Sequence, residues 1–432
     1  MDRPTLQTRR EFLRTTLLGG ALGWTLPSFL DMTIAEMARA ADGSLLQVDT
    51  GKDSPILVVI QLGGGNDGLN TVVPFADDDY HRARPTLGLK QSQCIPITDG
   101  LGLHPNLGDL KALLEEGHLA ILQGVGYPNP NRSHFRSMEI WQTASDADRT
   151  EPTGWVGRYF DNFCAGADAS VGVVMADQLP QAFASRWPRG ITLGRGSMQS
   201  AGAGEMSAGF GEPSDANAGS SIGELSGARR AHVSPLDYLE KVALDAQVAT
   251  ARVNRILSRR FGQPAYPVTP LARNLSVIAQ LIAGGMSTRV YYASLGGFDT
   301  HANQASTHAN LLAQFAGALR AFVQDLEAQG NLDRVAVLCF SEFGRRVREN
   351  ASSGTDHGAA APLFIAGGGL RAGLHGLAPS LAPQDLVRGD IPHQVDFRSV
   401  YATLLERHLK ADSLPVLGRR FARLDLWPVK PH

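Results

Sequence analysis

Five short runs of apolar residues, separated by longer amphipathic segments, set the strongest constraint on how this chain can fold. The runs cover residues 56–62 (ILVVIQL), 119–125 (LAILQGV), 289–295 (RVYYASL), 334–340 (RVAVLCF) and 362–366 (PLFIA). Continuous apolar runs of this length are typical of buried strands. Apolar residues at helical spacing occupy the intervening segments at 105–116, 234–259, 271–283, 305–329 and 397–409. Strands that alternate with helices predict an α/β fold whose largely parallel central sheet is covered on both faces.

Composition excludes several other classes of protein. The 432 residues include 40 Lys and Arg and 42 Asp and Glu, which gives a formal charge of −2. This balance excludes a broad electrostatic nucleic-acid binder and a polybasic protein of the membrane surface. The chain has only 3 Cys, far apart in the sequence. A disulfide framework and a cysteine-rich zinc site are therefore excluded as well.

The first 40 residues predict a signal for export by the twin-arginine pathway. Arg9 and Arg10 form the arginine pair, an apolar stretch with several glycines follows at 15–30, and residues 38–40 (ARA) match a cleavage site. The apolar stretch is too short and too rich in glycine to span a bilayer stably. The alternative is an amphipathic helix that stays attached. We expect a periplasmic or extracellular protein that meets the twin-arginine translocation machinery and has no stable membrane span.

Residues 41–432 predict a single domain with one flexible insertion. Residues 197–229 are rich in Gly, Ser and Ala and nearly free of large apolar side chains. Such a segment cannot bury enough surface to offset the entropy lost on ordering. We interpret it as a disordered linker, with a mobile lid as the alternative.

Polar residues follow the first two predicted strands, at the sheet edge where open parallel sheets bind ligands. Asp67 lies among four glycines after the first strand, where an Asp/Gly turn is the alternative to a ligand. Ser133 begins a helical pattern after the second strand, where it is a candidate helix cap or a nucleophile. Arg132, His134 and Arg136 surround this serine in the sequence, as an anionic substrate would require.

Acids, imidazoles and a guanidinium group collect near the ends of the later strands. They are Asp299, His301, Glu342, Arg345, Asp356 and His357. An oxygen and an imidazole ligand suit Zn²⁺, Mn²⁺ or Fe better than Ca²⁺. Asp356 is a ligand or, alternatively, an outer partner that holds the imidazole of His357. Helix caps and surface ion pairs are the structural alternatives for these residues.

Five motifs carry a resemblance to a known family: LGGGNDGLNTVVP, RSHFRSMEIWQTA, GGFDTHANQ, SEFGRR and GTDHG. The chain resembles, from about residue 56 to residue 409, a bacterial family of twin-arginine-exported proteins of unknown function. That family belongs to the alkaline phosphatase/sulfatase superfamily. The resemblance implies an alkaline phosphatase-like three-layer sandwich with a largely parallel central sheet.

The resemblance also implies roles for individual residues. Asp67 matches the first metal-binding acid of the superfamily, and Ser133 matches its nucleophile. Asp299 matches a later acid, but Asn303 stands where the pattern has His, so His301 takes that place.

The last two motifs align in one of two ways. In the first, Glu342 replaces an acid that a His normally follows, Phe343 occupies that position, and His357 is the final ligand. In the second, Asp356 and His357 are the Asp-His pair, and His375 is the final ligand.

These roles imply metal-dependent hydrolysis of a small phosphate or sulfate ester through a serine intermediate. The resemblance implies one or two divalent ions (Zn, Mn, Ca or Mg). One ion would be held by Asp299, His301 and His357. The other would be held by Asp67, Ser133 and Glu342, and Asp356 is a further candidate ligand. The implied catalytic residues are Ser133, His134 and Arg345, and Arg132 and Arg136 are alternative contacts to the ester oxygens. A non-catalytic exported binding or assembly protein of the same fold is the second hypothesis, and phosphomutase-type transfer is the third.

Overall fold

The computed structural model describes residues 54–186, 189–194, 248–259 and 265–428. The predicted signal peptide at 1–40 and the predicted insertion at 197–229 lie outside the described residues, so both stay predictions. The helix predicted at 234–259 is described only from residue 248, and residues 248–257 are helical.

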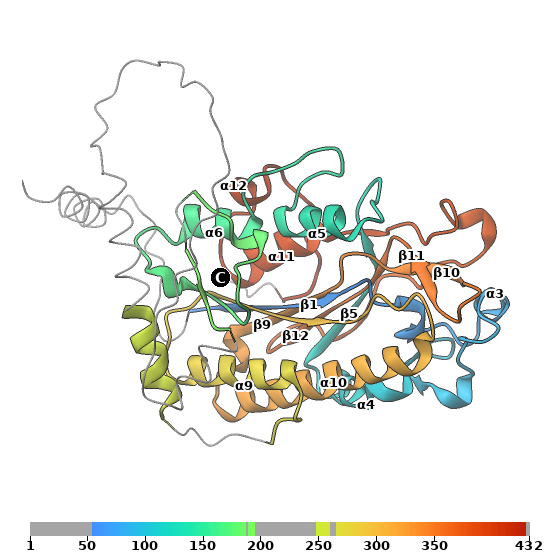
Figure 1. The fold of residues 1–432 in the computed structure, drawn as a ribbon, viewed down its shortest axis with the longest axis horizontal. Helices are drawn as coiled ribbons and strands as arrows, with labels where there is room; N and C mark the ends of the chain where they lie inside the picture. Colours follow the sequence, from blue (N-terminus) through green and yellow to red (C-terminus); the bar gives the residue numbers. More distant parts are fainter. Residues whose placement is uncertain (1–53, 187–188, 195–247, 260–264, 429–432) are drawn as a thin grey trace, which may run out of the picture. The chain divides into compact units, whose positions relative to one another are not determined.

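A mixed sheet forms the centre of the described part of the chain (Figure 1). Its strand order is β13-β5-β12-β9-β1-β8-β6-β7, and β14 pairs with β5. Its strands are β1 (Ile56–Gly63), β5 (Leu119–Gly126), β6 (Gly172–Val174), β7 (Ile191–Thr192), β8 (Val290–Gly296), β9 (Val335–Phe340), β12 (Ala361–Gly367), β13 (Gly373–His375) and β14 (Val395–Asp396). All five predicted strands are present, and the predicted α/β class with a largely parallel sheet is confirmed.

Strand β12 is the antiparallel member of this sheet. β1 pairs in parallel with both β8 and β9, whereas β12 runs antiparallel to β9 and to β5. The connection from β9 to β12 contains the short antiparallel strands β10 (Arg345–Glu349) and β11 (Thr355–His357) and no crossover helix. A parallel return would need such a crossover. The start of β12 consequently lies at the same sheet edge as the ends of β1, β8 and β9.

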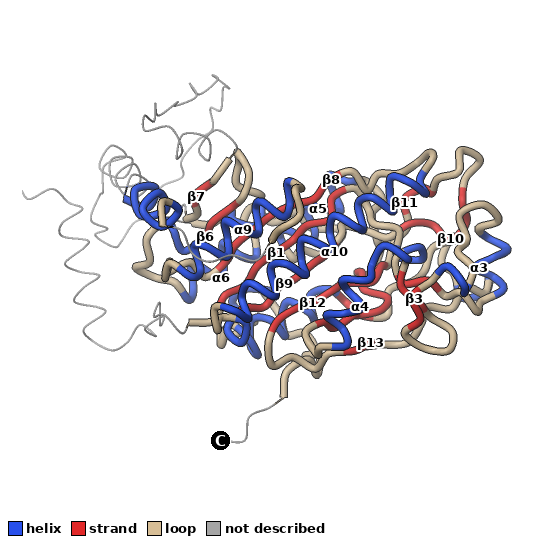
Figure 2. The backbone as a smooth tube through the Cα atoms, turned by 90° about the horizontal axis from the view of Figure 1, so that it is seen from below, coloured by secondary structure: helices blue, strands red, loops and turns tan. Residues whose placement is uncertain are grey.

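Helices cover both faces of the sheet (Figures 1 and 2). One layer contains α4 (Gly108–Glu115), α9 (Pro270–Ala283) and α10 (Gln304–Ala328), and the other contains α5 (His134–Thr143), α6 (Trp155–Phe163), α11 (Phe397–Thr403) and α12 (Leu414–Leu417). Side chains alternate along β1, so Val58 and Ile60 join the core under the first layer and Leu57 and Val59 join the other. This arrangement is the predicted three-layer sandwich.

Smaller elements lie beyond the ends of the central strands. They are the three-stranded sheet of β2 (Val72–Val73), β3 (Ile95–Pro96) and β4 (Gly102–Leu103), together with α3 (Asp78–Ala83). A π-helical turn, Leu404–His408, extends α11. None of the helices in the described ranges is both long enough and apolar enough to cross a membrane.

Two glycines allow the loops at this edge of the sheet to pack closely. Gly64 has a φ of +118°, and a Cβ atom there would lie 2.4 Å from the backbone nitrogen of Asp299. A Cβ atom on Gly354 would lie 2.2 Å from the carbonyl carbon of His301. The loops after β1, after β8 and before β11 therefore touch through their backbones, which brings their side chains together.

Candidate metal centre

Three histidines converge on Asp299 at the edge of the sheet. His134 is the first residue of α5, Asp299 and His301 lie in the loop after β8, and His357 ends β11. The Nε2 atoms of His301 and His357 each lie 3.0 Å from Asp299 Oδ1. His134 Nε2 lies 3.4 Å from the other oxygen of the same carboxylate, Oδ2. Three segments far apart in the sequence thus contribute imidazoles to one carboxylate.

The outward-facing nitrogen of each imidazole has its own partner. His357 Nδ1 lies 2.8 Å from the carbonyl oxygen of Arg132. His301 Nδ1 lies 3.2 Å from Asp356 Oδ1, and His134 Nδ1 lies 2.9 Å from Glu342 Oε1. A carbonyl or carboxylate oxygen only accepts, so each Nδ1 carries the proton and donates it. The three Nε2 lone pairs are then directed at the centre of the cluster.

This arrangement of lone pairs fits a bound cation. The Nε2 atoms of His301 and His357 lie 2.9 Å apart, although both are acceptors. His134 Nε2 is buried and has no hydrogen-bond partner in the described part of the chain. A cation between these atoms would satisfy all three lone pairs and the carboxylate. Histidines that bind metals usually donate their second ring nitrogen to a carboxylate or carbonyl, as all three do here.

The distances and the donor types indicate which ions would fit. Four ligands at about 2.0–2.1 Å around a tetrahedral ion lie about 3.3 Å from one another. The contacts around Asp299 range from 2.9 to 3.4 Å. One ligand atom each from His134, Asp299 and His357 also lies within 4.8 Å of the others. Three nitrogen donors and one carboxylate suit Zn²⁺ or a similar transition metal, whereas Ca²⁺ and Mg²⁺ prefer oxygen ligands.

Asp299 is held in its charged form. Burial alone would raise its pKa, but the hydrogen bond and the charge of Arg345 hold the pKa well below its usual range. Its side chain is 46% exposed, and that of His301 is 44% exposed. The cluster therefore combines a permanent negative charge with access from solvent.

Arg345 is a positioning residue beneath Asp299. Its side chain is completely buried and donates to the carbonyl oxygens of Gly65, Phe298 and Thr355 and to Asp299 Oδ1 at 2.7–2.9 Å. Arg345 was expected to contact the substrate. The structure contradicts this expectation, because the guanidinium group has no exposed surface.

The two alternative arginines are also engaged. Arg132 pairs with Asp390. Arg136 pairs with Glu139 and donates to backbone carbonyls, including that of Asp146 at 3.0 Å.

One acid of the implied second ion site, Asp67, is paired with a buried arginine. Asp67 Oδ2 forms an ion pair with Arg84 Nη1 at 2.5 Å, and both side chains are completely buried. Burial raises the pKa of Asp67, but the charge and hydrogen bond of Arg84 outweigh this effect and lower it. The predicted role of Asp67 as a ligand is therefore corrected to a buried structural ion pair.

Glu342 and Asp356 contact the outer nitrogens of His134 and His301. Glu342 Oε1 also accepts from the Gly64 N–H at 2.8 Å. Glu342 was expected to bind metal directly, and Asp356 was expected as a ligand or as an outer partner of His357. In the structure Glu342 contacts the outer nitrogen of a histidine, and so does Asp356, whose partner is His301 rather than His357. His375, the final ligand of the alternative alignment, lies on the edge strand β13 and contacts the carbonyl oxygen of Arg371.

Ser133 lies next to the cluster, at the N-cap position of α5. Its side chain makes no capping hydrogen bond and is exposed. The residue that follows it is His134, and the carbonyl of the preceding Arg132 holds His357. The hydroxyl group of Ser133 makes no hydrogen bond to any of the described residues. The sequence pointed to His134 as a catalytic residue, whereas its geometry is that of a ligand.

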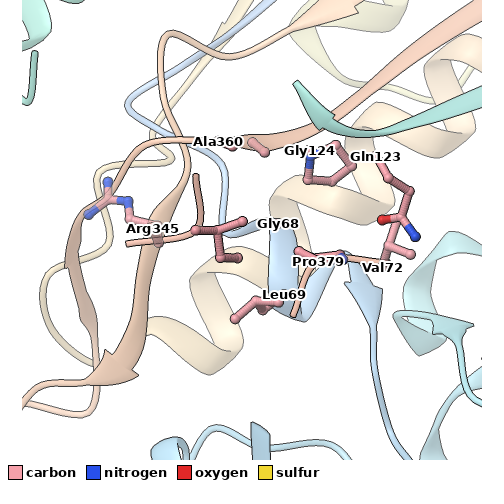
Figure 3. A pocket seen from close by; sticks show the side chains of 11 residues that line it. Gly68, Leu69, Val72, Gln123, Gly124, Arg345, Ala360 and Pro379 are labelled. Atoms are coloured by element: carbon pink, nitrogen blue, oxygen red, sulfur yellow. The ribbon is translucent and has the colours of Figure 1, made fainter. Parts of the chain in front are cut away.

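A small cavity near Arg345 is not a substrate site. It is lined by residues that include Gly68, Gln123 and Pro379, and its volume is about 20 Å³ (Figure 3). The Arg345 guanidinium group points away from Gly68 and Gln123 in this view. The side-chain nitrogen of Gln123 is buried without a hydrogen-bond partner in the described residues. The cavity has room for about one water molecule.

The fold and this cluster define an α/β protein with a candidate metal centre at the edge of its sheet. Residues 55–413 match the family described as "Protein of unknown function (DUF1501)", and the chain belongs to that family. The match confirms the family resemblance that the motifs predict. The comparison with curated proteins gave no match.

Solved structures similar to this chain include members of the alkaline phosphatase superfamily. The sulfatase PsFucS1 from Pseudoalteromonas sp. is 10% identical, with a TM-score of 0.36 over 89% of this chain and 72% of that chain. A protein in the alkaline phosphatase superfamily from Vibrio parahaemolyticus is 10% identical, with a TM-score of 0.36 over 86% and 72%. The C-terminal periplasmic domain of EcEptC from Escherichia coli, in complex with Zn, is 9% identical, with a TM-score of 0.32 over 74% and 75%.

Proposed function

We propose that this chain is an exported metal-dependent hydrolase of phosphate or sulfate esters with a serine nucleophile. The observation that carries the proposal is the convergence of three imidazole Nε2 atoms on the charged carboxylate of Asp299. A transition-metal ion held by Asp299, His134, His301 and His357 is the occupant that these donors fit best. The twin-arginine run at Arg9 and Arg10 supports export.

A bound ion would supply charge, and the side chains of the protein would hold the ligands in place. A bound divalent ion supplies positive charge that polarises an ester oxygen and favours ionisation of a nearby hydroxyl group. Glu342, Asp356 and the Arg132 carbonyl orient the three imidazoles, and Arg345 fixes Asp299. The buried arginine keeps the carboxylate ionised without contacting the substrate.

Ser133 is the proposed nucleophile. Its exposed hydroxyl group makes no capping hydrogen bond, and Ser133 is the N-cap residue of α5, whose N-terminal amides favour a nearby anion. In the first step Ser133 Oγ forms a bond to phosphorus or sulfur, the bond to the ester oxygen breaks, and the alcohol leaves with the hydroxyl proton. In the second step water cleaves the serine ester, which restores the hydroxyl group and releases phosphate or sulfate.

Two matched variants test this function. Aryl phosphate and aryl sulfate hydrolysis should be assayed with added Zn²⁺, Mn²⁺, Mg²⁺ or Ca²⁺. We expect Ser133→Ala to abolish turnover and to retain the metal, and Asp299→Ala to lose both. Ser352 is exposed in the loop before β11. The control variant Ser352→Ala should therefore show unchanged turnover. Undiminished turnover in Ser133→Ala would remove this residue from the mechanism.

A non-catalytic exported binding or assembly protein is the second candidate function. The observation that favours it is the buried ion pair of Asp67 with Arg84, which takes away one acid of the implied second ion site. This reading predicts that the purified protein binds one ion and turns over neither ester class with any of the four metals. Turnover above that of Asp299→Ala would exclude it.

A further inference from the structure

A cavity lined by arginines lies at the far end of α5 from the candidate metal centre. Its volume is about 250 Å³, and Ala144, the residue that follows α5, contributes to its wall. The 10 residues of α5 span about 15 Å, and His134 is at the opposite end of this helix. The two sites are therefore separate, and the inference does not depend on the proposed hydrolase activity.

Positive charge exceeds negative charge in this cavity. Its charged lining residues are Arg149, Arg158, Arg398, Arg419, Asp146 and Glu151. Asp146 accepts hydrogen bonds from Arg419, at 2.8 Å, and from Arg398. Asp396, which is not one of the lining residues, also accepts from Arg398. Glu151 is then the remaining lining acid for two arginines. One positive charge stays unbalanced.

The two remaining arginines form no ion pair or hydrogen bond with a carboxylate in the part of the chain that the structure describes. Arg158 donates only to oxygens of Thr143, Thr153 and Val416, at 2.5–3.3 Å. Arg149 is exposed, and its guanidinium group makes no hydrogen bond or ion pair within the described ranges. Burial lowers the pKa of Arg158, and the charge of Glu151 offsets only part of this effect.

Two further features suit an anionic ligand. Ser145 is among the residues that line the cavity and is only 5% exposed, and its buried hydroxyl has no hydrogen-bond partner in the described chain. Phe421 lies 5.0 Å from the guanidinium carbon of Arg398 and 4.9 Å from that of Arg419, which holds both groups at the wall. A buried hydroxyl without a partner is costly, and a bound oxygen atom would satisfy it.

We propose that this cavity binds an oxyanion of the phosphate or sulfate type, with Arg149, Arg158 and Ser145 as its donors. Guanidinium groups bind such anions through paired N–H donors. The volume leaves room for an organic group attached to the anion. Inorganic phosphate and a small phosphate monoester such as glycerol 2-phosphate are the two sources that the experiment should separate.

Isothermal titration of the purified protein with each anion tests the proposal. Arg149→Ala and Ser145→Ala should each weaken phosphate binding, Arg149→Ala by about tenfold or more. Arg273→Ala is the control, because this exposed residue lies on α9 across the sheet, and it should bind as the parent does. Asp299→Ala should also keep the binding, which separates the cavity from the metal centre.

Each result decides the proposal. Tighter binding of the monoester than of inorganic phosphate identifies an organic ligand, and the reverse order identifies the free anion. Loss of binding in Asp299→Ala would assign the anion to the metal centre and overturn the inference. Equal binding by the parent, Arg149→Ala and Ser145→Ala would overturn it too, as would no measurable heat with either anion.

Discussion

The Nε2 atoms of His301 and His357 lie 2.9 Å apart, and both rings use Nδ1 to donate to an oxygen. Two ring acceptors at this distance repel each other unless a positive charge lies between or beside them. Asp299 Oδ1 is 3.0 Å from each of the two nitrogens. The three atoms thus form one face of a coordination site, and His134 approaches from the other side of the carboxylate.

The first prediction concerns metal content. We expect the purified protein to bind one equivalent of Zn²⁺, because Asp67 pairs with Arg84 and the implied second ligand set therefore lacks one of its acids. Asp299→Ala and His357→Ala should abolish binding, and His134→Ala should weaken it. His375→Ala is the matched control, because this half-buried histidine lies outside the cluster. Elemental analysis and titration measure both quantities, and two equivalents in the parent would contradict the prediction.

The second prediction concerns the acids outside the ligands. Glu342→Gln and Asp356→Asn keep the size of the side chain but remove the charge that orients His134 and His301. Loss of such outer partners typically weakens metal binding by about 10–100-fold. Asp425→Asn, an exposed acid paired with Arg371, should leave the affinity unchanged. If Glu342 were a direct ligand, Glu342→Gln would instead abolish binding.

Much of the sheet could be predicted because buried strands leave a strong local signal. All eight residues of β5 and all six of β9 are buried, and both strands appear as apolar runs. Strands β7 and β14 have two residues each, which is too short for any periodicity to appear. β12 runs antiparallel because the connection from β9 contains no crossover helix. The apolar run of β12 itself carries no information about this direction.

The site could be predicted as a group, but not in its internal roles. His357 lies shortly before β12 in the sequence. Because β12 starts at the sheet edge where β8 ends, His357 lies beside Asp299. By contrast, Asp67 was expected to bind metal because the family resemblance aligns it with the first metal-binding acid, and its partner Arg84 lies 17 residues away in a loop without a motif. Which polar atoms pair depends on tertiary packing, so spacing alone cannot separate a ligand from a buried ion pair.

The third prediction separates these two roles by stability. Arg84→Met would leave the carboxylate of Asp67 buried without its cation, which typically costs about 3–5 kcal/mol. Arg82→Ala, two residues earlier in α3, removes only an exposed ion pair with Asp79 and should change stability by less than about 1 kcal/mol. Urea unfolding with chelator present measures both. A small effect of Arg84→Met would show that the carboxylate of Asp67 does not depend on this cation, which would contradict the structural role given to the ion pair.

The fourth prediction is that the protein loses stability in mild acid, because it buries neutral histidines. Burial lowers the pKa of His308 and of His408 from 6.5 to about 4. Between these values the unfolded chain binds protons that the folded chain does not, so the free energy of unfolding falls as the pH drops from about 6.5 to 4. Each histidine contributes up to roughly 3 kcal/mol to this loss.

The lowered pKa of Asp67 acts at a lower pH than these histidines. Its contribution is present above the ordinary value of 3.8 and is lost only as the pH falls below it. Urea unfolding between pH 8 and 4.5, with chelator present throughout, therefore reports mainly on the histidines. His308→Gln keeps a donor for Asn66 Oδ1, which His308 Nε2 contacts at 2.9 Å, but cannot be protonated. This variant should lose less stability than the parent between pH 6.5 and 4.5, and an identical pH dependence would exclude His308 as a cause.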